Sequence, residues 1–306
     1  MWEELHIASG MRCPIVMANA NRALSAPINI HGDHSDIMGV RDTGWAMMFA
    51  ETAQEAYDNT IIAFKVAEDP NVLLPVLTTL DGFVTSHAMD NCVMEEDQVV
   101  KDFVGDYKPL YPLLDTENPV GHGMFATLGN GYMKYKLTER HALDNALEAF
   151  EKHGKEWEEI TGRSFEVVDS WGAEDADYLI VVLGSCAGNA RHQARLLRAE
   201  GKKVGVVRPR IFRPFPAKQI VEACKNAKAV AVIDRSDSFG SPHAPLALEV
   251  RAAFQDAGLQ IPVSDYLAGM GGADITLDQM GQVYAELEQR AQGTYDGSIK
   301  YLGIEE

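Results

Sequence analysis

Short apolar runs alternate with helical patterns along the second half of the chain. Residues 178–183 form a continuous apolar run rich in β-branched side chains, which predicts a strand buried on both faces of a parallel sheet. Similar runs predict strands at 203–208, 229–233 and 261–266. The patterns between them predict helices at 190–200, from Pro216 onward, from Pro242 (capped by Ser241) to Gly258, and at 277–290. This alternation predicts βαβ units around a mainly parallel sheet.

The first half shows the same alternation less regularly. Apolar runs predict strands at 14–17 and 72–77, and a helix is predicted to end at residues 5–10. Residues 43–66 predict one long helix capped by Thr43, and residues 142–158 predict a charged helix. The polar stretch 162–177 then suggests a boundary, so we predict two α/β domains, residues 1–160 and 161–306. Because two strands make a thin domain, we expect the first domain to lack a front portion or to receive one from a partner chain.

Composition excludes several classes of function. The 306 residues include 27 Lys and Arg against 45 Asp and Glu, for a formal charge of −18. Such an acidic surface repels nucleic-acid phosphates, so no nucleic-acid partner is expected. No apolar run approaches the roughly 20 residues of a membrane helix, and the acidic start lacks the cationic head of a signal peptide. We therefore predict a cytoplasmic protein with no membrane partner.

The cysteines argue against a metal cluster held by this chain alone. Cys13, Cys92, Cys186 and Cys224 are far apart, and no C-x-x-C occurs. Iron–sulfur clusters and zinc ribbons need closely spaced thiolates, so neither is predicted. The expectation is four reduced, mostly buried thiols in a cytosolic protein.

The polar segment 19–45 follows the first predicted strand and is the main candidate for a site. Ligands of open α/β sheets collect beyond the carboxyl ends of strands, and a connection this long is typical of a functional loop. The Arg22 guanidinium suits bidentate binding of a carboxylate, and the alternative is an ion pair with Asp33 or Asp36. A metal site on His31, Asp33, His34 and Asp36 has suitable atoms, but we predict bonds within the loop instead, because the four lie within six positions.

A second polar segment, residues 78–87, contains Ser86 and His87 after an Asp81–Gly82 turn. A serine hydrolase is disfavoured because G-x-S-x-G is absent and adjacent side chains of an extended segment point apart. The alternative is a loop whose hydroxyls cap the next helix. The turn 184–188 lacks G-x-G-x-x-G spacing, which favours simple helix–strand packing over dinucleotide binding. Loops 234–240 and 269–274 could contact a ligand or a neighbouring subunit.

At these segments the sequence resembles a known family. The motifs are ANRALSAPINIHGDHSD (20–36), RDTGW (41–45), LDGFVTSH (80–87), LGS (183–185), RIFRPFP (210–216), DRSDSFG (234–240) and GMGGADIT (269–276). They occur in the order found in the α subunit of the thiamine-dependent pyruvate (2-oxoacid):ferredoxin oxidoreductases, and the resemblance covers essentially the whole chain.

The resemblance implies oxidative decarboxylation of pyruvate to acetyl-CoA, with electrons passed to ferredoxin. Thiamine diphosphate and Mg²⁺ would be shared with a β subunit, and coenzyme A would be a co-substrate. The partners would be β, γ and δ type subunits, and [4Fe–4S] clusters would lie only in partner subunits. The fold implied is a partial pyrimidine-type thiamine-binding domain followed by a transketolase C-terminal-like domain. Arg22 corresponds to the family arginine that holds the substrate carboxylate, whereas Asp33, His34 and Asp36 match the motif without an assigned role.

The sequence departs from the family in two places. The threonine-containing substrate loop and the thiamine-activating glutamate lie upstream of the family segment that matches residues 5–12, and Ala273 stands where members often have arginine. We therefore expect an α-subunit portion that is inactive alone, and we assign no catalytic residue to it. The alternatives are a non-catalytic scaffold subunit, the same chemistry on another small 2-oxoacid such as oxalate, or a nicotinamide dehydrogenase suggested by the alternating pattern alone.

Overall fold

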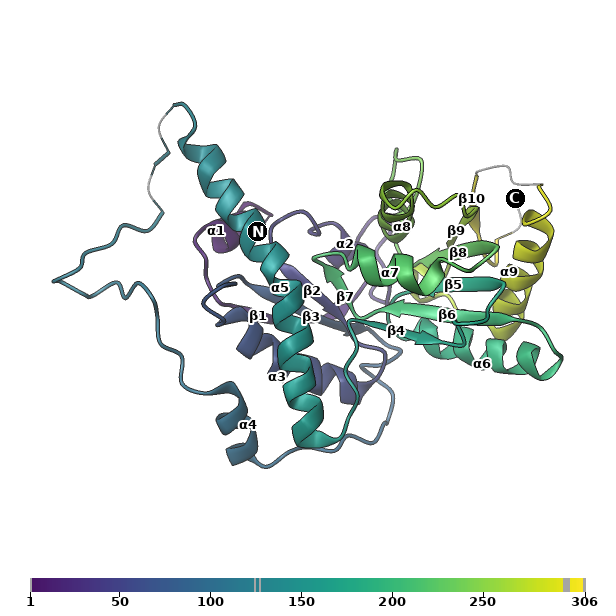
Figure 1. Cartoon of the computed structure of the whole chain (residues 1–306), viewed down its shortest axis with the longest axis horizontal. Helices are drawn as coiled ribbons and strands as arrows, with labels where there is room; N and C mark the ends of the chain where they lie inside the picture. The colour runs from purple at the N-terminus through teal and green to yellow at the C-terminus, as the bar shows by residue number, and fades with distance from the viewer. Residues whose placement is uncertain (1, 124, 127, 294–297, 305–306) are drawn as a thin grey trace.

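The computed structural model describes residues 2–123, 125–126, 128–293 and 298–304, which form two sheets with helices on their faces (Figure 1). The first sheet has the strand order β1-β3-β2-β7 and the second β10-β9-β8-β5-β6-β4. Most pairings are parallel; β7 on β2 and β4 on β6 are antiparallel. The prediction of an α/β fold with mainly parallel sheets is confirmed.

The first sheet is covered differently on its two faces. Its strands are β1 (Val16–Asn21), β2 (Ala46–Phe49), β3 (Val76–Asp81) and β7 (Ile211–Arg213). The helices of this half are α1 (Trp2–Gly10), α2 (Ser35–Met38), α3 (Ala53–Ala67), α4 (Asp97–Val104) and α5 (Gly131–Thr161). Side chains of α3 and α5, including Ile62, Phe150 and Trp157, bury one face. The other face joins a core shared with the second sheet, through Met47, Phe49 and Leu77 among others.

The predicted helix at 43–66 is wrong in its first part, where the chain forms strand β2. All four residues of β2 are buried, and Met47 and Met48 point into different cores, as alternate residues of a central strand do. The helix begins only at Ala53, and Thr52 rather than Thr43 caps it by accepting a bond from the Glu55 amide (3.2 Å). The predicted strand at 72–77 also lies too early, because β3 starts at Val76 although Val72 and Leu74 are buried.

The second sheet follows the predicted strands closely. Its strands are β4 (Val168–Trp171), β5 (Tyr178–Val182), β6 (Val204–Pro209), β8 (Ala229–Asp234), β9 (Val263–Leu267) and β10 (Ile299–Tyr301). Its helices are α6 (Cys186–Ala199), α7 (Ala217–Cys224), α8 (Pro245–Asp256), the short η1 (Met270–Gly272) and α9 (Leu277–Arg290). The polar stretch 162–177, where the sequence suggested a domain boundary, contains the edge strand β4, which was not predicted.

Helix α8 begins at Pro245, not at Pro242 as predicted. The Ser241–Pro242 signal lies in a turn, and Ala244 is the N-cap residue without a capping side chain. Instead the buried Asp234 carboxylate accepts bonds from the amides of Leu246 (3.0 Å) and Ala247 (3.2 Å). The helix start is therefore fixed by a side chain of a neighbouring strand, which no local sequence signal reports.

The two sheets are joined by continuous chain and by buried ion pairs. Strands β6 and β7 are separated only by Arg210, yet β6 belongs to the second sheet and β7 to the first. The buried Arg208 guanidinium pairs with Glu55 of α3 (2.8 Å) and with Asp169 of β4 (3.3 Å). Arg191 of α6 pairs with Glu51 (2.9 Å) just ahead of α3. We propose that the boundary between the two domains lies near residue 160.

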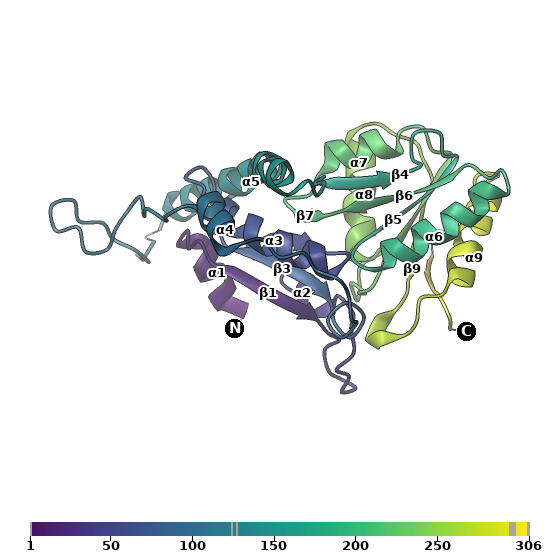
Figure 2. The same ribbon diagram turned by 90° about the horizontal axis from the view of Figure 1, so that it is seen from below.

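A long connection between α4 and α5 projects away from both sheets (Figure 2). We call its described part within residues 105–130 the arm. It exposes large apolar side chains, among them Leu113, Leu114 and Phe125. No helix within the described residues is long and apolar enough to cross a membrane.

Candidate functional site

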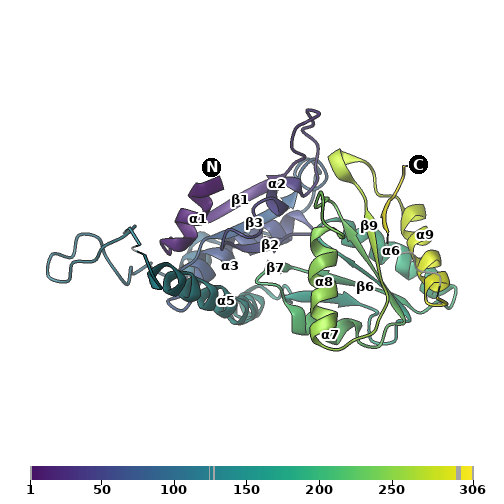
Figure 3. The same cartoon turned by 90° about the horizontal axis from the view of Figure 1, so that it is seen from above.

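The candidate site lies where β1 and β3 end side by side. Asn21, the last residue of β1, is paired in register with Asp81, the last residue of β3. Residues 22–34 then form a projecting loop, which we call the Arg22 loop, before α2 begins (Figure 3). The loop neck is closed by a bond from the Ala23 amide to the His31 carbonyl (2.9 Å). Carboxyl ends of parallel strands are the usual location of ligands in such sheets.

Arg22 presents an exposed guanidinium at this edge. Its Nε donates to the Ala23 carbonyl (2.9 Å) and its Nη2 to the Asn29 carbonyl (3.4 Å). No carboxylate among the described residues forms an ion pair with it, so the alternative pairing with Asp33 or Asp36 is not formed. Two loop carbonyls thus orient the group, and its further N–H donors have no acidic partner among the described residues, which suits binding of an external carboxylate.

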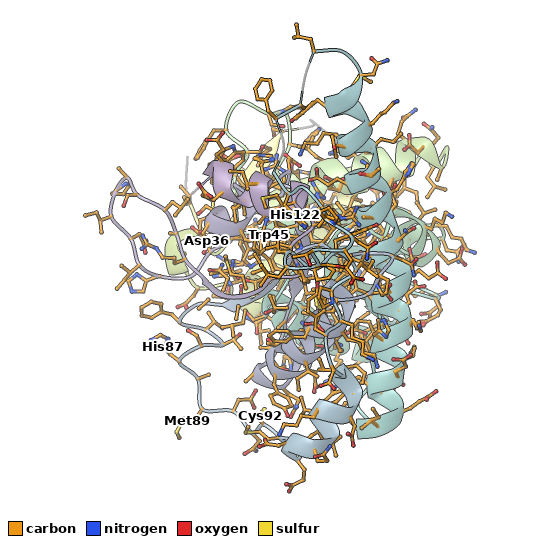
Figure 4. The ribbon with its side chains drawn as sticks, turned by 90° about the vertical axis from the view of Figure 1, so that its left-hand side faces the viewer. Asp36, Trp45, His87, Met89, Cys92 and His122 are labelled. Atoms are coloured by element: carbon orange, nitrogen blue, oxygen red, sulfur yellow. The ribbon has the colours of Figure 1, made fainter. Side chains whose placement is uncertain are left out.

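Asp36, labelled in Figure 4, has a structural function in this arrangement. Its carboxylate accepts bonds from the Asn19 amide side chain (3.0 Å), the Asn21 amide side chain (2.9 Å) and the backbone amides of Arg22 (3.0 Å) and Ile37 (2.7 Å). These four donors occupy both oxygens. Asp36 therefore fixes the end of β1 against α2 and directs the chain into the Arg22 loop.

Asp33 and His34 are buried, and their side chains have different partners instead of a common ligand. The Asp33 carboxylate accepts bonds from Ser35 and from the Gly271 amide (2.9 Å). The His34 Nε2 lies 2.6 Å from Asp81 Oδ1. Among the described residues no three His, Cys, Asp or Glu side chains gather as a metal site, and these side chains point to different partners.

Asp81 is a central residue of the site that sequence reasoning did not name as functional. It is 2% exposed, and besides His34 it contacts Arg235 Nη1 (3.1 Å) and the Ser185 amide (2.7 Å). Burial alone would raise the pKa of the Asp81 carboxyl, but His34 and Arg235 stabilise its charged form and hold the pKa below its ordinary range. The sequence placed Asp81 in a turn and Arg235 in a strand-end loop, and only the fold brings them together.

The segment after β3 contradicts two expectations from the sequence: that the side chains of Ser86 and His87 point apart, and that a hydroxyl of this segment caps the next helix. Ser86 Oγ lies 2.8 Å from His87 Nδ1, so these adjacent side chains meet rather than point apart. Ser86 Oγ also accepts a bond from the Phe83 amide (2.9 Å), and His87 stacks on the Phe83 ring at 4.5 Å. The hydroxyl closes its own turn and does not cap α4, and His87 lies on the outside of the molecule (Figure 4).

The thiols differ in burial more than predicted. Cys186 and Cys224 are buried, and burial raises the pKa of each thiol to about 12. Cys13 is half-buried and Cys92 is exposed. The expectation of mostly buried cysteines is therefore correct for two of the four.

The groove at the other end of the first sheet is separate from this site. It has a volume of about 980 Å³ and is lined by residues of α1, by the base of the arm and by Tyr132 and Tyr135 of α5. Arg12 and Leu73 in its wall precede β1 and β3, so the groove lies at the amino ends of these strands. Because the Arg22 loop lies at the carboxyl ends of the same strands, a substrate bound in this groove would not contact Arg22.

Comparison with known proteins identifies the family. Residues 1–156 match the family model described as pyruvate flavodoxin/ferredoxin oxidoreductase, thiamine diphosphate-binding, and residues 176–280 match the pyruvate:ferredoxin oxidoreductase core domain II. The chain is 42% identical over its whole length to pyruvate synthase subunit PorA of Thermotoga maritima, covering 77% of that protein. The chain belongs to the pyruvate:ferredoxin oxidoreductase family.

Other members of the family show the same coverage. PorA of Methanosarcina barkeri is 36% identical over 100% of this chain and 76% of its own length. The ketoisovalerate oxidoreductase subunit VorA of Pyrococcus horikoshii is 36% identical over 99% of this chain and 77% of its own length. A solved 2-oxoglutarate:ferredoxin oxidoreductase from Magnetococcus marinus aligns with a TM-score of 0.63 at 17% identity, over 93% of this chain and 50% of that one, and supports the fold.

Proposed function

We propose that this chain is the α-subunit portion of a 2-oxoacid:ferredoxin oxidoreductase that oxidatively decarboxylates pyruvate to acetyl-CoA and passes electrons to ferredoxin. Family membership and the pyruvate synthase subunits at 35–42% identity support this proposal. The similar identity to a ketoisovalerate oxidoreductase subunit means that overall identity does not select the side chain of the 2-oxoacid. We propose pyruvate as the substrate, with oxalate or a branched 2-oxoacid as the alternatives that the assay below compares.

One observation carries the proposal within this chain: the Arg22 guanidinium is exposed, oriented by two carbonyls and without an acidic partner among the described residues. A guanidinium in this state binds a planar carboxylate through two parallel N–H···O bonds. In a chain of charge −18, such a cation at the carboxyl ends of parallel strands is a suitable anchor for a small anionic substrate.

The proposed cofactors follow from the family to which the chain belongs. Thiamine diphosphate, when bound, supplies the carbanion and the electron sink for cleavage of the 2-oxoacid. Asp33, Asp36 and Asp81 already accept bonds from protein donors, so none of them is a free ligand for Mg²⁺. We assign Mg²⁺ and the diphosphate to a β-type partner, and the [4Fe–4S] clusters to partner subunits in a complex with β, γ and δ type chains. Coenzyme A is the proposed acyl acceptor.

The Arg22 loop also supports contact with a partner subunit. Its tip exposes Leu24, Ile28 and Ile30, and Ile28 is 85% exposed. Apolar side chains gathered on a projecting loop mark an interaction surface. We place the partner subunit over this tip, in a cytoplasmic complex in which Arg22 faces the shared cofactor.

The test is to replace Arg22 in the assembled complex and to measure pyruvate-dependent dye reduction. Arg22→Lys should lose about 2 kcal/mol or more of transition-state binding, seen mainly as a higher KM, because lysine cannot form the bidentate pair. Arg140→Lys is the matched control, since Arg140 is an exposed arginine on α5 that pairs only with Asp144 among the described residues.

Unchanged KM and kcat in Arg22→Lys would remove Arg22 from the site. A stable complex that contains this chain but no thiamine diphosphate, and that shows no pyruvate-dependent activity, would favour the non-catalytic scaffold. Comparing pyruvate, oxalate and 2-ketoisovalerate in the same assay identifies the substrate.

A further inference from the structure

We propose that Arg235 and Asp81 are positioning residues that form a buried clamp between the two sheets and hold the Arg22 loop in its substrate-binding conformation. This inference rests on the proposed function of Arg22. Neither residue reaches the Arg22 guanidinium in the structure, so both act through the loop. The second domain would thereby control substrate affinity at a site on the first.

The returning limb of the Arg22 loop, residues 29–34, is bonded to the second domain at several points. The Asn29 side chain donates to the Gly271 carbonyl (2.9 Å), and the Gly272 amide donates to the Gly32 carbonyl (2.9 Å). The Gly271 amide in turn donates to Asp33 Oδ2 (2.9 Å). Figures 2 and 3 show this limb beside the chain that follows β9 in both views. The returning limb is thus held by a specific partner segment, whereas the tip of the loop is exposed.

Arg235 connects three segments with one buried side chain. Its Nη2 donates to the carbonyls of Gly32 (2.9 Å) and Gly269 (3.2 Å), and its Nη1 pairs with Asp81 Oδ2 (3.1 Å). Its backbone carbonyl also accepts a bond from the His34 amide (2.9 Å). Since the side chain is 3% exposed, water can replace few of these bonds.

Asp81 forms the other half of the clamp and fixes it to β3. One carboxylate oxygen contacts His34 at the end of the Arg22 loop (2.6 Å), and the other contacts Arg235 and the amide and hydroxyl of Ser185. Asp81 therefore bonds at once to the Arg22 loop and to two segments of the second domain. Removing Asp81 leaves the buried Arg235 guanidinium without this carboxylate, whereas removing Arg235 leaves Asp81 with His34 and Ser185 as partners. Either change breaks contacts that join β3 and the Arg22 loop to the second domain.

The clamped limb is the one that orients Arg22. The Asn29 carbonyl accepts from the Arg22 guanidinium, and the His31 carbonyl accepts from the Ala23 amide. Displacement of residues 29–34 therefore moves an acceptor that orients the guanidinium. Misplacing a substrate-positioning group by about 1 Å can cost on the order of 100-fold in rate, so a small shift is sufficient.

The experiment compares Arg235→Gln with Arg191→Gln in the assembled complex. Arg191 also joins the two domains, through Glu51 (2.9 Å) and Asp169 (2.9 Å), but it does not contact the Arg22 loop. We expect Arg235→Gln to raise KM for pyruvate on the order of 10-fold or more, whereas Arg191→Gln leaves KM unchanged. Asp81→Asn keeps the side-chain shape and serves as a second variant should Arg235→Gln fail to fold.

Amide hydrogen exchange gives a readout that does not depend on activity. Exchange at Ala23 and Gly272 should become faster in Arg235→Gln and Asp81→Asn but not in Arg191→Gln. Equal KM values in the Arg235, Asp81 and Arg191 variants, or unchanged exchange in the loop, would overturn the clamp. That result is distinct from failure of the proposed function, which would appear as an unchanged KM in Arg22→Lys. If Arg22→Lys and Arg235→Gln each raise KM, the increase in log KM in the double variant should be smaller than the sum of the increases in the two single variants.

Discussion

Gly32→Ala is a severe test of how tightly the Arg22 loop is packed. A Cβ atom at Gly32 would lie 3.1 Å from the carbonyl carbon of Gly82 and closer still to its oxygen. The backbone of Gly82 cannot move aside easily, because its amide donates to the Asn21 carbonyl (3.1 Å) at the end of β1. The backbone angle φ of Gly32 is outside the left-handed region, so the cost arises from this overlap and not from conformational strain.

The overlap sets the size of the expected effect. Overpacking of a rigid site costs about 1–3 kcal/mol of the free energy of unfolding. The loop can escape the overlap only by moving away from Gly82, and a shift of about 1 Å at a substrate-positioning loop can cost on the order of 100-fold in rate. We therefore expect lower stability together with a KM for pyruvate raised on the order of 10- to 100-fold.

Gly131→Ala is the matched control. Gly131 is the first residue of α5, its φ is also outside the left-handed region, and an added Cβ would meet nothing within 4 Å. Urea unfolding of the chain and steady-state kinetics of the complex should show the control within about 0.5 kcal/mol of wild type, with unchanged KM. If Gly32→Ala behaves like Gly131→Ala in both assays, the loop is not packed as described.

Two further predictions test the buried charges and the helix packing. The pKa of Asp81 is lowered below its ordinary value of 3.8, so its contribution to stability is present above that pH and is lost as the pH falls further; urea unfolding should show a steeper loss below pH 4 for wild type than for Asp81→Asn. Gly154→Ala should gain about 1 kcal/mol of helix propensity but lose more, because the added Cβ would overlap the buried Phe165 ring; a Tm below that of wild type confirms this, and a higher Tm contradicts it.

The second half of the fold could be predicted because its strands are fully buried runs separated by well-marked helices. The prediction of one helix over residues 43–66 was wrong for a physical reason. The four buried residues of β2 are followed, after a short turn, by the apolar face of α3, and a short apolar run does not distinguish a strand from a helix. Residues 46–49 form a strand because they pair with β3 and with β7, which comes from much later in the chain.

The location of the site could be predicted from the sequence, but the contacts of its individual residues could not. The residue types and the strand-end position of the Arg22 loop indicated an anion anchor, and the structure shows its guanidinium exposed. The uses of Asp33 and His34 could not be predicted, because their partners lie far away in sequence: His34 meets Asp81 47 positions away, and Asp33 meets Gly271 238 positions away. Contacts of this kind depend on the relative placement of two sheets, which local patterns do not contain.

The passage from β6 to β7 limits how the polypeptide can be dissected in the laboratory. A fragment that stops near residue 160 would lack β7 and leave the buried edge of β2 unpaired, a template for aggregation. Expression of the halves as separate proteins should therefore give insoluble material for the first half, whereas co-expression with a piece that begins before β4 could restore the missing strand in trans. Because only Arg210 separates β6 from β7, there is no flexible linker at this point that could act as a hinge. Rotation of one sheet relative to the other would therefore require β7 to separate from β2.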